Sequence, residues 1–412
     1  MNNYRIKNKW LILFGAILAQ LTIGAMYAWS LFNKPLSEAF NWEMADVVRT
    51  YGIALAAFSL TTIYSGQLQL KKGPRVTSLI GACLYSGGII LSSFAKSPEM
   101  LYVTYGLMAG SGVGFVYVCQ LSTLVKWFPK SKGMITGVAT GAFALGAYLF
   151  KNVIQSMLSG KEYTPELISS TFMSLGIIYA VMSIIGSLLL DVPEGCETKS
   201  KARVSDGPDF SPKQLLGMGN FYKLLFSDLL ALMPGLLIIG IANDLGTEWF
   251  DAKTGAALVG MLALFNAGGR LASGKLADKF GALRVYRVMY IVVIVALAVL
   301  ATHPSKMVFM AVVLTIAVGY GSFLSLVPTV VGRLFGAKNF SANYGLVFQA
   351  YGMAAMIGIS IKNYTKTFET AFTIALATAV VGYILAMLIK ESPQVSEEDE
   401  KPEISIDDAE KA

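Results

Sequence analysis

The chain has 412 residues, of which 55% are hydrophobic and only 14% are charged. A soluble domain usually carries about 25% charged residues, so this composition predicts a polytopic membrane protein and excludes a large soluble catalytic domain. The net charge of +7 does not indicate nucleic-acid binding, because the bases lie mostly in short loops. The three cysteines are widely spaced, and no residue pattern predicts a metal site, a cofactor or an enzyme active site.

Hydrophobic stretches need about 20 residues to cross the hydrocarbon core of a bilayer. The chain contains twelve such stretches, and the first is longer than the apolar core of a cleavable signal peptide. We therefore expect an all-α membrane protein with spans at 10–32, 46–69, 76–95, 100–125, 133–156, 170–190, 221–243, 254–277, 284–302, 307–331, 341–362 and 368–389.

Lysine and arginine in the short loops predict the orientation, because these residues accumulate on the cytoplasmic side. One side carries basic clusters such as Lys71–Arg75 and Lys126–Lys132, whereas the other side carries only scattered lysines. We therefore place both termini in the cytoplasm and the chain in the cell membrane as a multi-pass protein, and we expect it to function as a monomer.

Two polar segments interrupt or end the hydrophobic pattern. The segment 191–219 contains prolines and charges of both signs, and the segment 391–412 is acidic, which is typical of disorder. The predicted organisation is a cytoplasmic N-terminal tail at 1–9, a six-helix bundle at 10–190, a cytoplasmic linker at 191–219, a second six-helix bundle at 220–390 and a cytoplasmic tail at 391–412.

The fifth predicted span carries glycines at a spacing of four, Gly133, Gly137 and Gly141. One turn of a helix separates neighbouring members of this ladder, so the glycines share one face. Small residues on one face let two membrane helices approach closely, and the ladder therefore predicts tight helix packing.

The two halves of the chain repeat. The segment Gly66–Gly73 (GQLQLKKG) follows the second span, and Gly274–Gly281 (GKLADKFG) follows the eighth span 208 positions later. After the fourth and tenth spans, Phe128 and Phe335 occupy corresponding positions in basic segments. Two motifs in the same order at nearly one offset indicate a parallel duplication, which is an architecture of transporters.

The repeated loop resembles the signature loop of the major facilitator superfamily, and this resemblance implies two six-helix bundles. The second copy is intact, and the resemblance assigns Gly274, Asp278, Lys279 and Gly281 to a gating loop. In the first copy Leu70 stands where the acid is expected, so the resemblance supplies no gating ion pair in the first half.

Further elements resemble the oxalate:formate antiporter family within that superfamily. They are Tyr27-Ala-Trp-Ser-Leu-Phe32, Tyr117-Val-Cys-Gln120, Lys126-Trp-Phe-Pro129 and Ser341-Ala-Asn-Tyr-Gly345. This resemblance implies transport of small organic anions by alternating access. It assigns the substrate site to Arg270 and to three aromatic residues, Tyr27, Tyr117 and Tyr320.

One departure from that family concerns the substrate. Family members that take oxalate have a lysine in the eleventh span, and in this chain the position is Tyr351. A dicarboxylate would then bring a second anionic group with no cation to compensate its desolvation. We therefore predict a monocarboxylate of the pyruvate, lactate or formate type, as in the branches of the family that lack the lysine.

Arg270 also stands out without the resemblance. An arginine in a membrane span costs about 2.5–3.5 kcal/mol on insertion scales, so it should face protein, water or an anion. The repeat places Thr62 at the corresponding position of the first half, so the scaffold does not require the charge. Asn266 lies one turn earlier and could hold the guanidinium, whose planar fork suits a carboxylate. Alternatively, Arg270 reaches the cytoplasmic surface or pairs with Asp278.

Two more residues complete the predicted substrate site. Tyr351 and Gln120 could add a hydroxyl and an amide donor beside the three tyrosines. The alternative is that these side chains only pack, because aromatic residues in membrane spans often fill cores or form interfacial belts.

Few other charges lie within the spans. Asp228 is the candidate for proton coupling, because burial favours the neutral form of a carboxyl group, although an interfacial acid or a partner of Lys223 is an alternative. Lys151 and Lys362 lie near the outer ends of corresponding spans. We expect them to anchor the outer interface, or alternatively to attract anions to the outer mouth.

These observations predict a secondary active transporter that moves a small organic monocarboxylate across the cell membrane by alternating access. Its partners would be the organic anion, protons if it is a symporter, and the lipid bilayer. Anion exchange is the other coupling mode. The alternative functions are an oxalate/formate-type dicarboxylate exchanger, a major facilitator transporter of an unrelated solute such as a drug, and a membrane sensor or enzyme that does not transport.

Overall fold

The structure is a computed structural model that describes the backbone of residues 8–158, 160–193, 209–250, 252–302, 304–365 and 367–390. Side chains are described for the same residues except 240–249, 252–257, 259 and 358–364. Residues 1–7 of the predicted N-terminal tail lie outside the described residues. The same holds for the predicted tail 391–412 and for residues 194–208 of the predicted linker.

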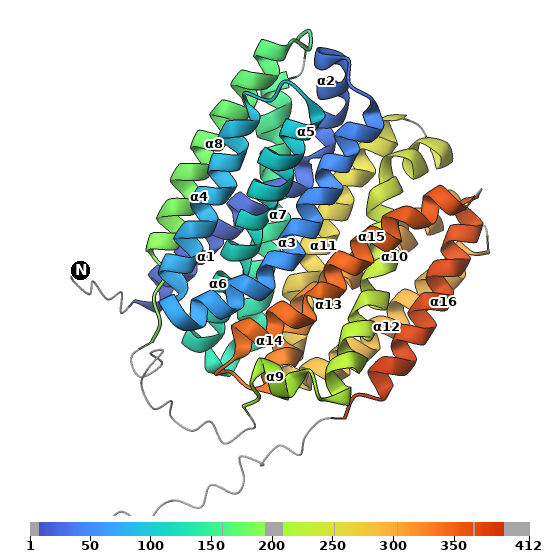
Figure 1. Cartoon of the computed structure of the whole chain (residues 1–412). Helices are drawn as coiled ribbons and strands as arrows, with labels where there is room; N and C mark the ends of the chain where they lie inside the picture. The colour runs from blue at the N-terminus through green and yellow to red at the C-terminus, as the bar shows by residue number, and fades with distance from the viewer. Residues whose placement is uncertain are drawn as a thin grey trace, which may run out of the picture.

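The described chain is helical, with two groups of helices that lie beside each other (Figure 1). The first group comprises α1 (Lys9–Gly24), η1 (Ala25–Ala28), α2 (Ser30–Phe40), α3 (Met44–Lys72), α4 (Pro74–Ser92), α5 (Pro98–Leu101), the π-helical η2 (Tyr102–Ala109), α6 (Gly110–Trp127), η3 (Pro129–Ser131), α7 (Lys132–Leu158) and α8 (Pro165–Leu188). The second group comprises α10 (Gly219–Trp249), α11 (Ala252–Phe280), α12 (Ala282–Leu300), α13 (Lys306–Phe335), α14 (Phe340–Val347), α15 (Gln349–Tyr364) and α16 (Phe368–Met387).

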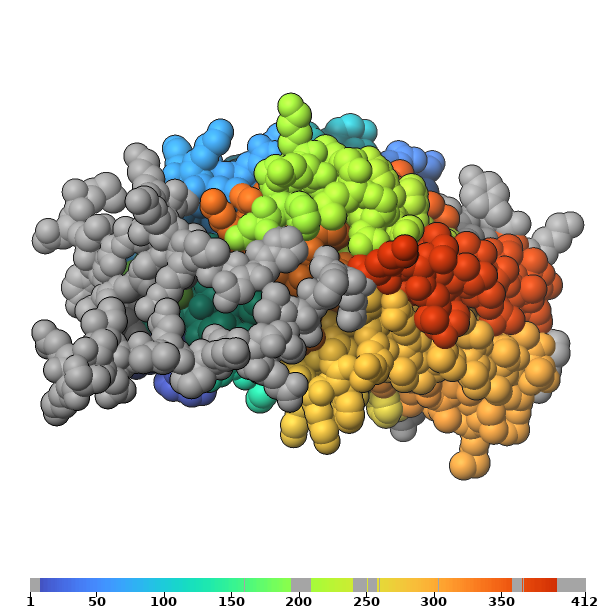
Figure 2. All heavy atoms as spheres, turned by 90° about the horizontal axis from the view of Figure 1, so that it is seen from below, coloured from blue at the N-terminus to red at the C-terminus, as the bar shows by residue number. Residues whose placement is uncertain are grey.

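The short helix α9 (Pro212–Leu215) lies at the end of the molecule where the basic loops gather, here called the basic face. The chain just before α9 is fixed to the second half of the molecule. The Phe210 backbone N–H donates to the Phe335 carbonyl at 3.1 Å, and the Phe210 carbonyl accepts from Asn343 Nδ2 at 2.8 Å. In Figure 2, which views this end, the yellow-green residues of α9 and α10 border the red α16, and α16 in turn borders the gold residues of α11 and α12.

Each predicted span coincides with helix, but three spans are irregular. The predicted span 100–125 runs through α5, the π-helical η2 and α6. The predicted span 10–32 divides into α1, the tighter turn η1 and the start of α2. The predicted span 341–362 divides at Phe348 into α14 and α15. Tyr27 lies in η1 and Tyr351 lies in the first turn of α15, so both tyrosines are placed by an irregularity in a helix, which is a frequent sign of a functional position.

Ten helical segments are long and apolar enough to cross a membrane, judged over the described residues alone. The predicted spans 254–277 and 341–362 are not among the ten. Some side chains of each lie outside the description, and the second is divided at Phe348.

The glycine ladder of α7 packs against α11, as its spacing predicts. A Cβ built on Gly137 would lie 2.6 Å from the carbonyl oxygen of Arg270, and one on Gly141 would touch Leu271 at 3.5 Å. The absence of side chains on this face lets the two helix backbones meet at the level of Arg270. The close approach brings the backbone of the first half within reach of the arginine of the second half.

We expect Gly137→Ala to destabilise the protein by about 1–3 kcal/mol, because the added methyl group overpacks this contact. The matched control is Gly268→Ala on α11, where a Cβ would meet nothing within 4 Å. Because alanine is the better helix former, the control should be neutral or slightly stabilised. The unfolding midpoint of each purified variant in detergent measures the effect, and equal midpoints for the two variants would contradict this packing argument.

Candidate functional site

The site is built around the guanidinium group of Arg270 on α11, whose residue is only 1% exposed. Its Nε donates to Asn266 Oδ1 at 2.8 Å, one turn earlier on the same helix. Its Nη1 donates to the backbone carbonyl of Thr140 on α7 at 2.7 Å. Arg270 therefore neither reaches the surface nor pairs with Asp278, the two alternatives that the sequence left open.

The third nitrogen of this guanidinium, Nη2, is buried and has no hydrogen-bond partner among the described residues. The ring of Phe143 covers one side of the group, with its centroid 5.9 Å from Cζ. Both other nitrogens have neutral acceptors, so the described surroundings provide no counter-charge. A buried cation that keeps a free donor is a site at which an anion gains both charge and hydrogen bonds.

A cavity of about 460 Å³ lies between the two halves, and Arg270 does not line it but is bound to Asn266, which does. Three of the predicted site residues line it, namely Asn266, Tyr27 and Tyr320. Its other described lining residues are mostly small or apolar, and none is acidic. The cavity extends along α7 away from the basic face, as far as Lys151 and Gln155.

A hydrogen bond between Tyr27, which lines the cavity, and Tyr351, which does not line it, joins the two halves. Their hydroxyl oxygens lie 2.5 Å apart, and either hydroxyl can donate. Tyr351 is 1% exposed and stacks on Phe348, with ring centroids 5.0 Å apart. The position at which oxalate-transporting family members have a lysine is thus filled by Tyr351, whose hydroxyl bonds to that of Tyr27.

Tyr117 lies behind the cavity and does not line it. It packs edge-on against Phe143 at 5.6 Å, the same ring that covers Arg270. Its hydroxyl oxygen lies 3.4 Å from that of Tyr344 and within electrostatic reach of both Arg270 and Asp228. The structure therefore places Tyr117 behind the ring that covers the guanidinium.

The structure does not bring Gln120 to the cavity. Gln120 is fully buried, and its Nε2 donates to Ser78 on α4 at 3.1 Å, inside the first half. Gln120 follows Tyr117 by about one helical turn, yet its amide is bound inside the first half, by α4. The prediction that its amide contacts the substrate is corrected on this point.

Asp228 on α10 is buried, at 3% exposure, but it does not line the cavity. Its Oδ1 has no hydrogen-bond partner in the described part of the chain. Lys223, the alternative partner, donates instead to the Leu388 carbonyl at 3.1 Å. Asp228 and Arg270 are the only buried residues with charged side chains among those described.

The predicted gating loop contacts α7 at the basic face through Asp278. Its carboxylate accepts hydrogen bonds from the backbone N–H groups of Gly133 and Met134, both at 2.7 Å. These groups belong to the first turn of α7, where a helix has free donors and a partial positive charge. Gly274 packs directly against Gly133, so the loop and the first turn of α7 meet backbone to backbone.

Lys279 and Gly281 follow Asp278 in the loop at the basic face. They line a polar pocket of about 330 Å³ together with Arg284 and Arg333. Gly281 has a φ of +86°, a conformation that favours glycine and begins α12.

The corresponding contact of the first half has no carboxylate. Gly66 of α3 packs against the backbone of Ser341 and Ala342 in α14, and Ser341 Oγ donates to the Gly66 carbonyl at 3.1 Å. The absence of an acid at Leu70 therefore leaves a close glycine contact and a neutral hydrogen bond in place of a charge-assisted one.

Several lining residues were not predicted as site residues, among them Asn33, Tyr51 and Gln155, and the sequence left Lys151 open between two interpretations. A signal for part of this set exists in the sequence. The α7 residues Ala144, Ala147, Tyr148, Lys151 and Gln155 follow Thr140 at helical spacing on one face.

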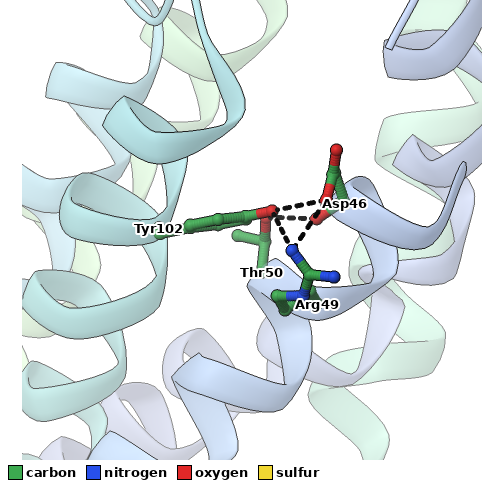
Figure 3. Close-up of polar contacts among 4 residues, drawn as sticks. All are labelled: Asp46, Arg49, Thr50 and Tyr102. Atoms are coloured by element: carbon green, nitrogen blue, oxygen red, sulfur yellow. Dashed lines mark hydrogen bonds and ion pairs between the residues drawn. The ribbon is translucent and has the colours of Figure 1, made fainter. Parts of the chain in front are cut away.

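At the opposite end of the molecule, polar residues fasten parts of the first half to each other (Figure 3). Asp46 on α3 binds Arg49 at 2.8 Å and accepts from the hydroxyl of Tyr102 on η2 at 3.1 Å. This cluster links α3 to η2 within one half, whereas Asp278 links the two halves.

Comparison with known proteins identifies the superfamily. The family profile described as Major Facilitator Superfamily matches residues 10–359 and 226–407. An Escherichia coli (strain K12) protein named uncharacterized MFS-type transporter YhjX is 28% identical, with 86% of this chain and 87% of that protein covered. The oxalate:formate antiporter of Oxalobacter formigenes is 26% identical, with 93% and 91% covered, and monocarboxylate transporter 13 of Bos taurus is 24% identical, with 90% and 87% covered.

Solved structures show the same fold. The crystallised proton:xylose symporter XylE superposes with a TM-score of 0.75 at 14% sequence identity, covering 93% of this chain and 96% of that one. The predicted fold class, an all-α membrane protein of the major facilitator fold, is therefore confirmed.

We expect Asp278→Asn to weaken closure of the basic face, because asparagine is uncharged and keeps one acceptor oxygen for the two N–H groups that the two carboxylate oxygens bind. A loss of about 1.5–3 kcal/mol would shift the balance of closed and open forms by about tenfold or more. Distances between spin labels on the two halves at the basic face measure the shift. Asp46→Asn is the control, because it removes a carboxylate that bonds within one half; equal distance distributions in both variants would show that Asp278 does not hold the face closed.

Proposed function

The chain belongs to the Major Facilitator Superfamily, and within this family of multi-pass membrane transporters we propose that it carries a small organic monocarboxylate by alternating access. The substrate class we propose is that of pyruvate, lactate or formate. Arg270 would bind the carboxylate, with Asn266, Tyr27 and Tyr320 around it.

The observation that carries this proposal is the free Nη2 of a buried arginine that is bound to Asn266, a lining residue of a cavity without described acidic residues. A cationic drug would meet repulsion from this group, and a neutral sugar would leave its charge uncompensated. A carboxylate would supply both a negative charge and acceptor oxygens for the planar fork of the guanidinium. Asn266 supports the proposal because it fixes Nε and so orients the fork.

The preference for one carboxylate rests on Tyr351. A dicarboxylate needs a second cation near the first, and the tyrosine pair of Tyr27 and Tyr351 occupies the position at which the family resemblance would place it. The relatives include both an oxalate:formate antiporter and a monocarboxylate transporter, so relationship alone does not decide between these substrates.

The proposed mechanism is a rocking motion of the two halves about Arg270. The arrangement with Asp278 bound to α7 and the cavity extending to the other end corresponds to a form open away from the basic face. Reorientation would break the contacts at the basic face and the Tyr27–Tyr351 bond. Asp228 remains the candidate for proton coupling, because its carboxyl group is buried and its Oδ1 has no hydrogen-bond partner among the described residues.

We expect Arg270→Gln to abolish saturable monocarboxylate uptake, with kcat/KM reduced by about a hundredfold or more, because removal of one partner of a buried charge pair costs 2–5 kcal/mol. Proteoliposomes with labelled pyruvate, lactate, formate and oxalate, with and without a proton gradient, measure the effect and separate symport from exchange. Arg287→Gln is the matched control, because the described partners of this arginine of the same half are the carbonyls of Ala386 and Ile389.

Full activity of Arg270→Gln would make this arginine structural. Efficient oxalate exchange by the unaltered protein would favour the dicarboxylate alternative. Absence of transport of every carboxylate by the folded protein would favour a solute of another class.

We expect Tyr351→Lys to increase recognition of oxalate relative to pyruvate by about tenfold or more, because it restores a second cation near Arg270. Inhibition of labelled pyruvate uptake by unlabelled oxalate measures the change. Tyr351→Phe removes the bond to Tyr27 without adding charge and serves as the control. Equal competition by oxalate in all three proteins would show that the residue at position 351 does not set the preference for a monocarboxylate.

A further inference from the structure

The outer part of the cavity contains a lysine that the site around Arg270 does not use. Lys151 belongs to the face of α7 that lines the cavity. This face begins at Thr140, whose carbonyl oxygen binds Arg270, and continues for three turns away from the basic face. A carboxylate that approaches Arg270 along the cavity therefore passes Lys151.

The ammonium group of Lys151 points across the cavity towards α11. Its Nζ would lie 3.7 Å from a Cβ built on Gly260. Gly260 precedes Asn266 by six residues, or about 9 Å along the helix axis, and Asn266 marks the level at which the Arg270 guanidinium is held. The two cations thus lie at different depths along the same path.

Lys151 has no hydrogen-bond or ion-pair partner among the residues that the structure describes, and neither has the side chain of Asn33 or Gln155, which also line the outer cavity. Two other cations near this end are neutralised. Lys34 pairs with Glu38 at 3.5 Å, and Arg49 pairs with Asp46 at 2.8 Å. The outer cavity therefore combines a free positive charge with two amide side chains, and the buried atom without a partner is the acceptor Oδ1 of Asn33.

This placement favours a role of Lys151 in attracting anions over a role in anchoring the outer interface. A lysine that anchors a helix at the membrane interface extends its ammonium group towards the lipid head groups. Lys151 instead extends between the two halves of the protein. The side chain of Lys362, its counterpart in the repeat, lies outside the described residues.

We propose that Lys151, with the amides of Asn33 and Gln155, forms a second anion-binding station that captures a small carboxylate before it reaches Arg270. This inference rests on the proposed function. The levels of Gly260 and Asn266, at which the two cations contact α11, are about 9 Å apart along the helix axis, which exceeds the length of a two- or three-carbon acid, so a small anion occupies one station at a time. The outer station acts on capture, because a positive charge within a narrow cleft raises the local concentration of anions and their association rate.

The test compares Lys151→Gln with the unaltered protein in proteoliposomes, using initial rates of labelled pyruvate uptake at low and high salt. We expect the KM of the variant to rise about three- to tenfold at low salt, with the maximal rate largely retained. At high salt the two KM values should converge, because salt screens the lysine. The matched control is Lys161→Gln, which removes an exposed lysine that lies beyond the end of α7 and does not line the cavity.

A second variant tests the charge independently of folding. Lys151→Cys, in a chain whose Cys83, Cys119 and Cys196 are replaced by alanine, is modified with aminoethyl or sulfonatoethyl methanethiosulfonate. The positive reagent should restore a low KM on the same folded sample, and the negative reagent should raise the KM further.

Each outcome is decisive. An unchanged KM in Lys151→Gln, a KM that changes equally in Lys161→Gln, or equal effects of the two reagents would overturn the outer station while leaving the proposed function intact. Absence of carboxylate uptake by the unaltered protein would overturn the proposed function, and the station with it.

Discussion

A buried guanidinium, held by a backbone carbonyl across the interface between the two halves, is the contact on which the site depends. Arg270 would be costly in this interior without acceptors, and Asn266 and Thr140 supply two. Thr140 comes within reach because α7 has glycines where it meets α11. The packing of small residues, the orientation of the arginine and the free donor beside the cavity are thus consequences of one close helix contact.

The two halves are alike in architecture but close the basic face by different chemistry. On one side the Asp278 carboxylate accepts from the first turn of α7, and on the other side Gly66 and Ser341 meet with a neutral hydrogen bond. A charge-assisted bond is roughly twice as strong as a neutral one, but the α3 side makes more neutral bonds across the interface, because Ser59, Thr62 and Gln349 also join α3 to α14 and α15. The α7–α11 side also carries Arg270, so the charge-assisted contact at the basic face and the proposed anion-binding residue belong to one helix.

The sequence predicted the parts of this protein that depend on local pattern. Hydrophobic length gave the helices, the repeat and the loop motif gave the superfamily, and the isolated charge in an apolar span gave Arg270. The interruptions at Ala25–Ala28 and Phe348 have no marker such as proline, so they could not be predicted from pattern. The direction of Gln120 towards Ser78 depends on how α6 is rotated against α4, and the bond between Tyr27 and Tyr351 joins residues from opposite ends of the chain. Such contacts are set by packing of the whole molecule.

The acceptor that Thr140 offers to Arg270 has an evolutionary consequence. It is a main-chain oxygen, and the hydroxyl of Thr140 is engaged separately with the carbonyl of Thr136 in its own helix. Exchange of the residue at position 140 therefore leaves the oxygen in place as long as the helix keeps its course. Homologues can exchange Thr140 for other residues that fit its buried position and still preserve the interaction, so its importance would leave little trace in an alignment. The trace would appear instead at the glycines, which alone permit the two backbones to meet.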